Sequence, residues 1–113
     1  MAEGVRRGDI FSVSAPGDYG KPRPAMVLQT DVLNDLKFAS VVVCPMTSTL
    51  TDAPLLRITV NPSEGNGLKK ESQLMVDKVQ AVSLSRVGER IGRLDASTLQ
   101  KVNRSLVFVL GLG

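Results

Sequence analysis

The chain has no histidine and no tryptophan, and it contains one tyrosine, Tyr19, and one cysteine, Cys44. Without histidine, imidazole-based acid–base catalysis is excluded, and no His/Cys cluster can be assembled for a zinc ion. A single cysteine cannot form an internal disulfide, and its place in an apolar run predicts a buried structural thiol. The sequence therefore predicts no metal centre and no cofactor.

Long apolar runs are also missing. No stretch approaches the roughly 20 residues needed to span a bilayer, and residues 1–9 lack the apolar middle region of a signal peptide. No Walker loop or dinucleotide fingerprint occurs, and residues 64–67 (EGNG) are predicted to form a turn rather than a phosphate cradle. These absences predict a cytoplasmic protein, without membrane association.

The 113 residues are predicted to form one domain, residues 1–113, with a single core. The formal net charge is +3 and the sequence pI is about 9.4. This mild basic excess is compatible with a nucleic acid or another polyanion as partner, but it does not identify one.

Short strands are predicted along most of the chain. Residues 9–14 alternate apolar and polar side chains, which predicts a half-buried strand, and residues 24–29 are apolar enough for a central one. A short helix or excursion is expected at 30–37. Further strands are predicted at 39–45, where proline closes the strand, at 55–60 and at 87–93. Residues 72–82 give either one long bent strand or two.

The last segment changes period. Asp95 is predicted to cap a helix, and apolar residues then recur at helical spacing until Gly111 ends the run. The recurring residues are Leu99, Val102, Leu106, Val109 and Leu110. We expect this helix to lie on the sheet, near a subunit contact. Short strands with little helix between them favour a mainly β fold, a small antiparallel barrel with a C-terminal helix.

Arg23 stands between two prolines, Pro22 and Pro24, immediately ahead of an apolar run. Proline fixes its own φ and drives the preceding residue into extended geometry, so Arg23 is predicted to be held rigidly where a loop becomes a strand. A rigidly mounted guanidinium suits a phosphate. The alternative is that Pro-Arg-Pro only ends a loop and the arginine is solvated.

Four sequence blocks together resemble the MazF/PemK family of toxin endoribonucleases from type II toxin–antitoxin pairs. They follow in family order: residues 7–11 (RGDIF), 20–28 (GKPRPAMVL), 43–48 (VCPMTS) and 71–77 (ESQLMVD). The resemblance covers almost the whole chain. It implies an SH3-like barrel of the MazF/PemK/CcdB type, a homodimer, and sequence-specific, metal-independent cleavage of single-stranded RNA. It also implies a cognate antitoxin, expected to be acidic and partly disordered.

The resemblance assigns the scissile phosphate to Arg23 and Thr47. Family members commonly carry a glutamate five residues before the arginine, and this chain has Asp18 there. Some members also have a second arginine and a histidine, where this chain has Met75 and Gly17. Those departures leave Arg23 and Thr47 as the matching pair.

Metal-free cleavage lets the ribose 2′-OH attack the adjacent phosphorus, which requires a proton acceptor, stabilisation of phosphoryl charge and a donor for the leaving oxygen. Arg23 can supply charge and donors but stays protonated, so it is a poor base. Thr47, or Ser48 beside it, can donate to a non-bridging oxygen. Asp18 is predicted as the base or proton relay, with Asp77 second. Substrate contacts are predicted for Tyr19, Lys21, Ser48, Asp77 and Gln80.

These residues also have simpler explanations. Thr47 and Asp18 could only satisfy turn backbone, and Asp77 with Lys78 could be an exposed pair. Tyr19 could stack on a base or cover the barrel mouth. Lys69, Lys70 and the basic residues within 86–93 could be solvated or could guide an RNA backbone.

Two other functions are compatible with the fold. One is a toxin that binds a protein such as gyrase, although the C-terminal sequence VLGLG lacks the aromatic and Ile ending of such toxins. The other is a non-catalytic nucleic-acid-binding barrel.

Overall fold

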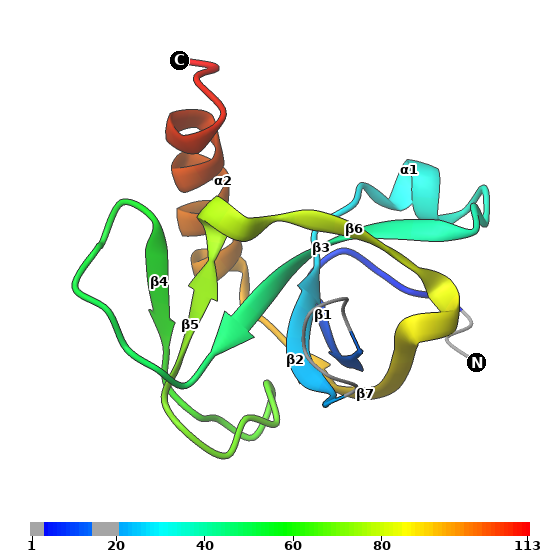
Figure 1. Ribbon diagram of the computed structural model, residues 1–113, viewed down its shortest axis with the longest axis horizontal. Coiled ribbons are helices and arrows are strands. Elements are labelled where there is room, and N and C mark those ends of the chain that lie inside the picture. Colours follow the sequence, from blue (N-terminus) through cyan, green and yellow to red (C-terminus); the bar gives the residue numbers. More distant parts are fainter. Residues whose placement is uncertain (1–3, 15–20) are drawn as a thin grey trace.

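The computed structural model describes residues 4–14 and 21–113; Gly17, Asp18 and Tyr19 lie outside the described residues. Strands dominate this part of the chain (Figure 1). They are β1 (Asp9–Val13), β2 (Arg23–Val27), β3 (Ser40–Thr47), β4 (Arg57–Val60), β5 (Ser72–Met75), β6 (Gln80–Ser83) and β7 (Val87–Arg93). The helices are α1 (Asp31–Asn34), α2 (Ala96–Val109) and two 3₁₀ turns, η1 (Val76–Lys78) and η2 (Leu84–Arg86).

All strand pairs are antiparallel, in the order β4-β5-β3-β2-β1-β7, with β6 also paired to β3. The predicted mainly β fold with a C-terminal helix is confirmed, and β2 is central, between β1 and β3. The alternative left open for residues 72–82 resolves into two strands, β5 and β6, separated by η1.

Strand β3 is the strand that joins the two parts of the sheet. Residues 40–43 pair with β6, residues 43–45 pair with β2, and the last two residues, Met46 and Thr47, pair with β5. The prediction that Pro45 closes this strand was wrong. Pro45 is the last residue paired with β2 and directly precedes the first one paired with β5, so its missing N–H falls where the strand changes partner.

The core lies on both faces of the sheet. Ile10 belongs to one buried cluster with Met26 and Leu74, whereas Phe11, the next residue, belongs to the other with Val27. Successive side chains of a strand point to opposite faces, so β1 is covered on both sides. The prediction of a half-buried strand at 9–14 was therefore wrong, because the sheet curls and covers the second face.

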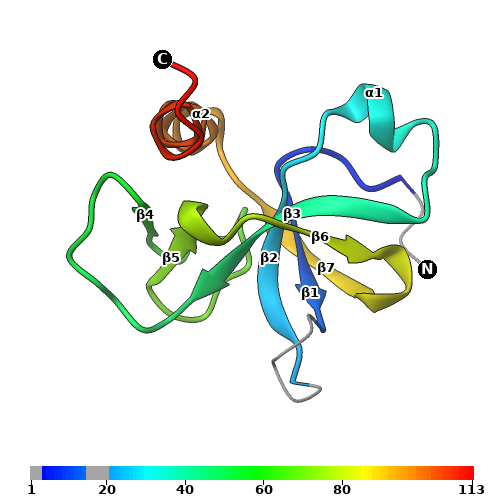
Figure 2. The same ribbon diagram turned by 45° about the horizontal axis from the view of Figure 1, so that its top comes forward.

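Helix α2 begins as predicted. The carboxylate of Asp95 accepts from the Thr98 backbone N–H at 3.2 Å and from the Thr98 hydroxyl at 2.6 Å. Val102 is fully buried against the sheet core, and the helix packs against β4 and η1 (Figure 2). Gly111 adopts a φ of 68° just beyond the helix, as expected of a C-terminal glycine. Leu110 is 59% exposed, so its predicted place in the buried stripe was wrong.

Cys44 is fully buried, as predicted, and burial raises the pKa of its thiol to about 12. None of the helices within residues 4–14 and 21–113 has the length and apolar character needed to cross a membrane.

Candidate active site

A surface pocket of about 560 Å³ collects side chains from β2, β3, β7 and the connection between β4 and β5. We call it the Arg23 pocket. Its lining includes Arg23, Thr47 and Ser48, together with basic residues that are distant from them in sequence. Arg23 and Thr47, which lie 24 positions apart in the sequence, are thereby brought to one hollow.

Arg23 is the first residue of β2 and lies opposite Val13 of β1. Pro24 follows within the strand, opposite Ser12, so the extended geometry predicted from the two prolines is confirmed. The Arg23 side chain is exposed, and it also lines a smaller neighbouring hollow of about 150 Å³ that includes Gln80 and Lys78. Arg23 therefore lies between two hollows of one surface.

Thr47 is the last residue of β3 and is half-buried. Its hydroxyl oxygen accepts a hydrogen bond from the Thr49 backbone N–H at 3.1 Å. The simpler explanation, that this threonine supports a turn, is thus correct as far as it goes. A hydroxyl has one donor and two acceptor positions, so accepting from Thr49 does not consume the hydrogen that a phosphate oxygen would need.

The segment after Thr47 is held by Gln73, which sequence reasoning missed. Gln73 lies opposite Thr47 in the β3–β5 pair and is buried. Its amide donates to the Thr51 carbonyl at 3.0 Å, and its side-chain oxygen accepts from the Thr51 N–H at 3.0 Å. The side chain therefore pairs with Thr51 as a neighbouring strand would. A glutamine in an otherwise buried strand was the available signal, since buried amides need partners.

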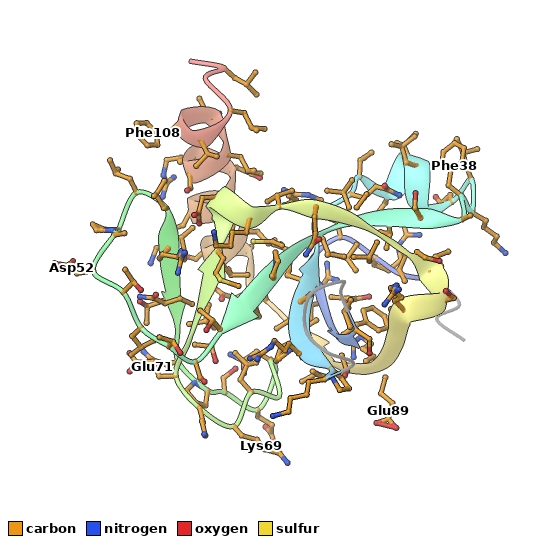
Figure 3. The ribbon with its side chains drawn as sticks, in the orientation of Figure 1. Phe38, Asp52, Lys69, Glu71, Glu89 and Phe108 are labelled. Atoms are coloured by element: carbon orange, nitrogen blue, oxygen red, sulfur yellow. The ribbon has the colours of Figure 1, made fainter. Side chains whose placement is uncertain are left out.

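The basic part of the pocket consists of Lys69 and Lys70, which precede β5, and Arg90 of β7. Glu89 is the acidic residue of the lining, and Figure 3 shows Glu89 and Lys69 at the same edge of the molecule. The described lining thus carries four Lys or Arg side chains, Arg23 included, against one carboxylate. Such an excess of positive charge favours a polyanion.

The connection that presents Lys69 is built around Asn66, a buried residue. The Asn66 side-chain oxygen accepts from the backbone N–H groups of Ser63 and Leu68, each at 3.0 Å, and its amide donates to the Asn61 carbonyl at 2.9 Å. The predicted turn at 64–67 is confirmed, and Arg93 N–H donates to the Gly65 carbonyl at 2.9 Å to fix the turn against β7.

The other candidate residues are spread more widely. Lys21 is exposed just ahead of β2, and Gln80 lies in the smaller hollow, opposite Val43. Asp77 accepts from Arg57 Nε at 3.1 Å and lies 3.7 Å from Lys78 Nζ, and the hydrogen bond from Arg57 lowers the pKa of the Asp77 carboxyl. Its carboxylate is thus engaged with a residue that lines a separate groove beside α2. Among the described residues, no group of three or more His, Cys, Asp or Glu side chains could hold a metal ion.

Comparison with known proteins decides the family. Residues 6–110 match the family described as the PemK-like, MazF-like toxin of type II toxin–antitoxin systems. The chain belongs to this MazF/PemK family. It is 44% identical over 109 residues to a protein of Mycolicibacterium smegmatis named probable endoribonuclease MazF, which covers 96% of this chain and 98% of the relative. Endoribonuclease EndoA of Bacillus subtilis is 24% identical over 112 residues, 96% of each chain.

Solved structures agree with this MazF/PemK assignment at the level of the fold. The Mycobacterium tuberculosis toxin MazF-mt6 superposes with a TM-score of 0.80 at 24% identity, covering 93% of this chain and 98% of that one. A mycobacterial endoribonuclease in complex with its cognate antitoxin also gives 0.80, at 21% identity and 96% coverage of each chain. The resemblance found in the four sequence blocks is therefore confirmed.

Proposed function

We propose that this MazF/PemK-family toxin cleaves single-stranded RNA in the Arg23 pocket, by attack of a ribose 2′-OH and without a metal ion. The chain is an endoribonuclease toxin of a type II toxin–antitoxin system, as its family and its 44% identity to a probable MazF endoribonuclease indicate. The observation that supports the proposed site is that Arg23 and Thr47 line one pocket.

The scissile phosphate would lie between these two side chains. The Arg23 guanidinium offers parallel N–H donors to two phosphate oxygens, and its fixed charge offsets the negative charge that develops as the 2′-oxygen attacks. The Thr47 hydroxyl donates to a non-bridging oxygen while Thr49 holds the same oxygen atom in place. Donors that are placed before the reaction suit a transition state better than mobile ones, because they need no reorganisation.

The base proposed for the 2′-OH is Asp18, which precedes Arg23 by five positions in the sequence and lies outside the described residues. Asp77, the second candidate, is held by Arg57 and is less suited to take a proton, because the ion pair favours its charged form and lowers its basicity. Asp18→Asn tests this role: a cleavage rate equal to that of the unaltered protein would eliminate Asp18 as base.

The remaining parts of the proposal concern binding. Lys21, Ser48 and Gln80 surround Arg23 or Thr47 in sequence or in the adjoining hollows and are proposed to contact substrate, with Tyr19 stacking on a base. Ser48 lines the Arg23 pocket itself. An RNA-cutting toxin must be held inactive in its own cell, so we propose an acidic antitoxin segment that covers the basic pocket. The toxin would act as a homodimer of single-domain chains in the cytoplasm, where its substrate is.

The test is cleavage of an unstructured RNA by the purified protein in EDTA. We expect fragments with a 5′-hydroxyl, which polynucleotide kinase labels without prior phosphatase treatment. Arg23→Ala is expected to reduce kcat by at least about 10²-fold, the usual loss when a transition-state donor is removed. Arg104→Ala, which removes an exposed arginine of α2, is the control and should retain full activity. No cleavage by the unaltered protein would favour a non-catalytic RNA-binding role.

A further inference from the structure

We propose that Arg90, which is held by the buried carboxylate of Asp9, binds a second phosphate of the RNA, next to the one held by Arg23 and Thr47. This inference rests on the proposed function and assigns a role to a further residue that lines the same pocket. The pocket volume of about 560 Å³ is far more than one phosphate group fills, so it can take a stretch of nucleic-acid chain.

The buried carboxylate of Asp9 holds two arginines and a backbone N–H. Its side chain is only 6% exposed, and Oδ1 accepts from Arg93 Nη1 at 2.8 Å and from Arg90 Nη2 at 3.4 Å. Oδ2 accepts from the Arg6 backbone N–H at 3.1 Å. A buried carboxylate must be paired, and one arginine together with a backbone N–H already supplies that pairing. The second arginine is therefore more than Asp9 needs.

An irregularity in β7 directs Arg90 to this carboxylate. Residues three apart on a regular strand point to opposite faces, so Arg90 and Arg93 would not normally meet one side chain. The register between β1 and β7 shifts between Ile10 and Phe11, so that Arg90 rather than Ile91 lies opposite Phe11. Such bulges change the direction of side chains and are frequent beside active sites.

The two arginines then differ in what they can do. Arg93 makes the short hydrogen bond to Asp9 and is not among the residues that line the Arg23 pocket. Arg90 makes the longer bond through Nη2, has a side chain 53% exposed, and does line the pocket. A guanidinium has five N–H donors, so the bond to Asp9 leaves others for phosphate oxygens while it restrains the side chain.

The charges around Arg90 favour a phosphate. Lys69 and Lys70 line the same pocket as Arg90, and Glu89 is the acidic residue of the described lining. Asp9 does not cancel Arg90, because Arg93 shares the carboxylate. The scissile phosphate of RNA is followed by another at each nucleotide, so a chain held at Arg23 presents a neighbouring phosphate to the pocket. Phosphate contacts of this kind position the chain without reading bases.

The experiment compares Arg90→Gln with Arg93→Gln. The two variants are a matched pair, because both remove an arginine that contacts Asp9 but only Arg90→Gln removes a positive charge from the pocket lining. Cleavage of a short RNA oligonucleotide is measured in EDTA over a range of salt concentrations. Binding of a 2′-O-methyl RNA, which cannot be cleaved by this chemistry, is measured alongside. Arg93→Lys and Arg90→Lys, which keep the charge, are included in case a glutamine variant fails to fold.

For Arg90→Gln we expect KM and the Kd of the 2′-O-methyl RNA to rise about 10-fold, with kcat within about twofold. The slope of log Kd against log salt is expected to fall by about 0.7, the value for one phosphate contact to a single strand. Arg90→Lys should restore most of the affinity. Arg93→Gln should lower the melting temperature while KM and the salt slope stay unchanged.

Equal effects of Arg90→Gln and Arg93→Gln on KM and salt slope would overturn the inference, because Arg90 would then act only through Asp9. Unaltered KM and an unaltered salt slope in Arg90→Gln would overturn the inference as well, because Arg90 would then make no contact with the RNA backbone. Failure of the unaltered protein to cut RNA would instead contradict the proposed function, so the two failures are distinguishable.

Discussion

At the residue scale, Thr47 supports a turn and also lines the pocket that we propose as the active site. It accepts the Thr49 backbone N–H at 3.1 Å, and it lines the pocket that contains Arg23. Valine keeps the shape and removes the hydroxyl, so it would remove both contacts, whereas serine keeps both. The two contacts are told apart by measurement, because kinetics reports the phosphate contact and unfolding reports the turn.

Thr47→Val is expected to lower kcat by roughly 10²-fold, since a phosphate oxygen loses a donor that is fixed before the reaction. The free energy of unfolding should fall by only about 1 kcal/mol, the usual net contribution of one hydrogen bond. Thr47→Ser should retain most of the activity. Thr49→Val, an exposed threonine beside it, is the control. Kinetics and thermal unfolding of the four proteins check this, and full activity in Thr47→Val would contradict the assigned role.

Asp77 was predicted from the sequence as a substrate contact and as the second candidate base, but its carboxylate forms an ion pair with Arg57. The hydrogen bond from Arg57, at 3.1 Å, lowers the pKa of its carboxyl, and the side chain is 26% exposed. A folded-state pKa below the unfolded value means that the native state favours the charged form. The resulting stability is present above the unfolded pKa, about 4 for aspartate, and is lost as the pH falls through the folded-state pKa.

Asp77→Asn should therefore reduce stability at pH 7 by less than about 1 kcal/mol, because the pair is partly screened by solvent. The difference from the unaltered protein should shrink as the pH falls below about 4. Urea unfolding at several pH values measures this difference in stability. The control is Asp52→Asn, which changes an exposed carboxylate in the connection between β3 and β4 (Figure 3). A difference that stays constant down to pH 2 would show that the ion pair is not its cause.

At the scale of elements, strand and helix positions followed from the sequence wherever the cause was local. Asp95 starts α2 because an aspartate side chain can accept the N–H of the first turn, and β7 coincides with the predicted strand at 87–93. The end of β3 could not be predicted, because Pro45 is tolerated only on account of a change of partner strand. A local sequence pattern does not determine which distant strands will pair.

The contact between the 61–68 connection and β7 is another feature that local patterns did not reveal. Gly92 lies in β7, and a Cβ atom there would stand 2.4 Å from the Asn66 carbonyl carbon and oxygen. Gly67 has a φ of 68° and would place a Cβ 2.2 Å from the Ile91 carbonyl oxygen. The two backbones therefore approach as closely as glycine allows.

Gly92→Ala is expected to destabilise the protein by roughly 2–3 kcal/mol, because backbone atoms cannot move aside as a flexible side chain would. Gly65→Ala is a matched control in the same connection, since its nearest neighbour to a new Cβ is the Ser63 hydroxyl oxygen at 4.0 Å. Denaturant unfolding compares the two variants. Equal stabilities would mean that the connection can move away from β7 without cost.

The site divides in the same way. Arg23 was proposed from the sequence because Pro22 and Pro24 constrain it, and Thr47 because residues 43–48 resemble a block of the MazF/PemK family. The basic residues within 86–93 had two possible roles from the sequence, but the pairing of Arg90 with Asp9 could not be predicted. It joins residues 81 positions apart and depends on a register shift in β7. Asp18 and Tyr19 lie outside the described residues, so their roles stay predictions.

At the scale of the whole molecule, exposed apolar side chains gather at two separate places. Phe108, 57% exposed, lies near the C-terminal end of α2, and Phe38, 50% exposed, lies beyond α1 at the other side (Figure 3). Leu110 and Leu112 extend the first group. The amphipathic pattern of α2 predicts that a subunit contact lies near this helix.

Phe108→Glu should therefore weaken a homodimer, because it places a charge in an apolar contact. Phe38→Glu, at a similarly exposed phenylalanine far from α2, is the matched control and should leave the assembly intact. Sedimentation velocity over a range of protein concentrations measures both. A monomer produced by Phe38→Glu alone would move the subunit contact to the α1 side.

Strand β3, which both parts of the sheet share, has a consequence for how the toxin unfolds. Since residues 40–45 of β3 pair with β6 and β2 and its last two residues pair with β5, loss of β3 removes strand pairing from both parts of the sheet. We expect a single all-or-none unfolding step. Thr47 lies at the end of this shared strand. Heat or proteolysis would therefore leave only fully active and inactive molecules, with no partly active form of the nuclease.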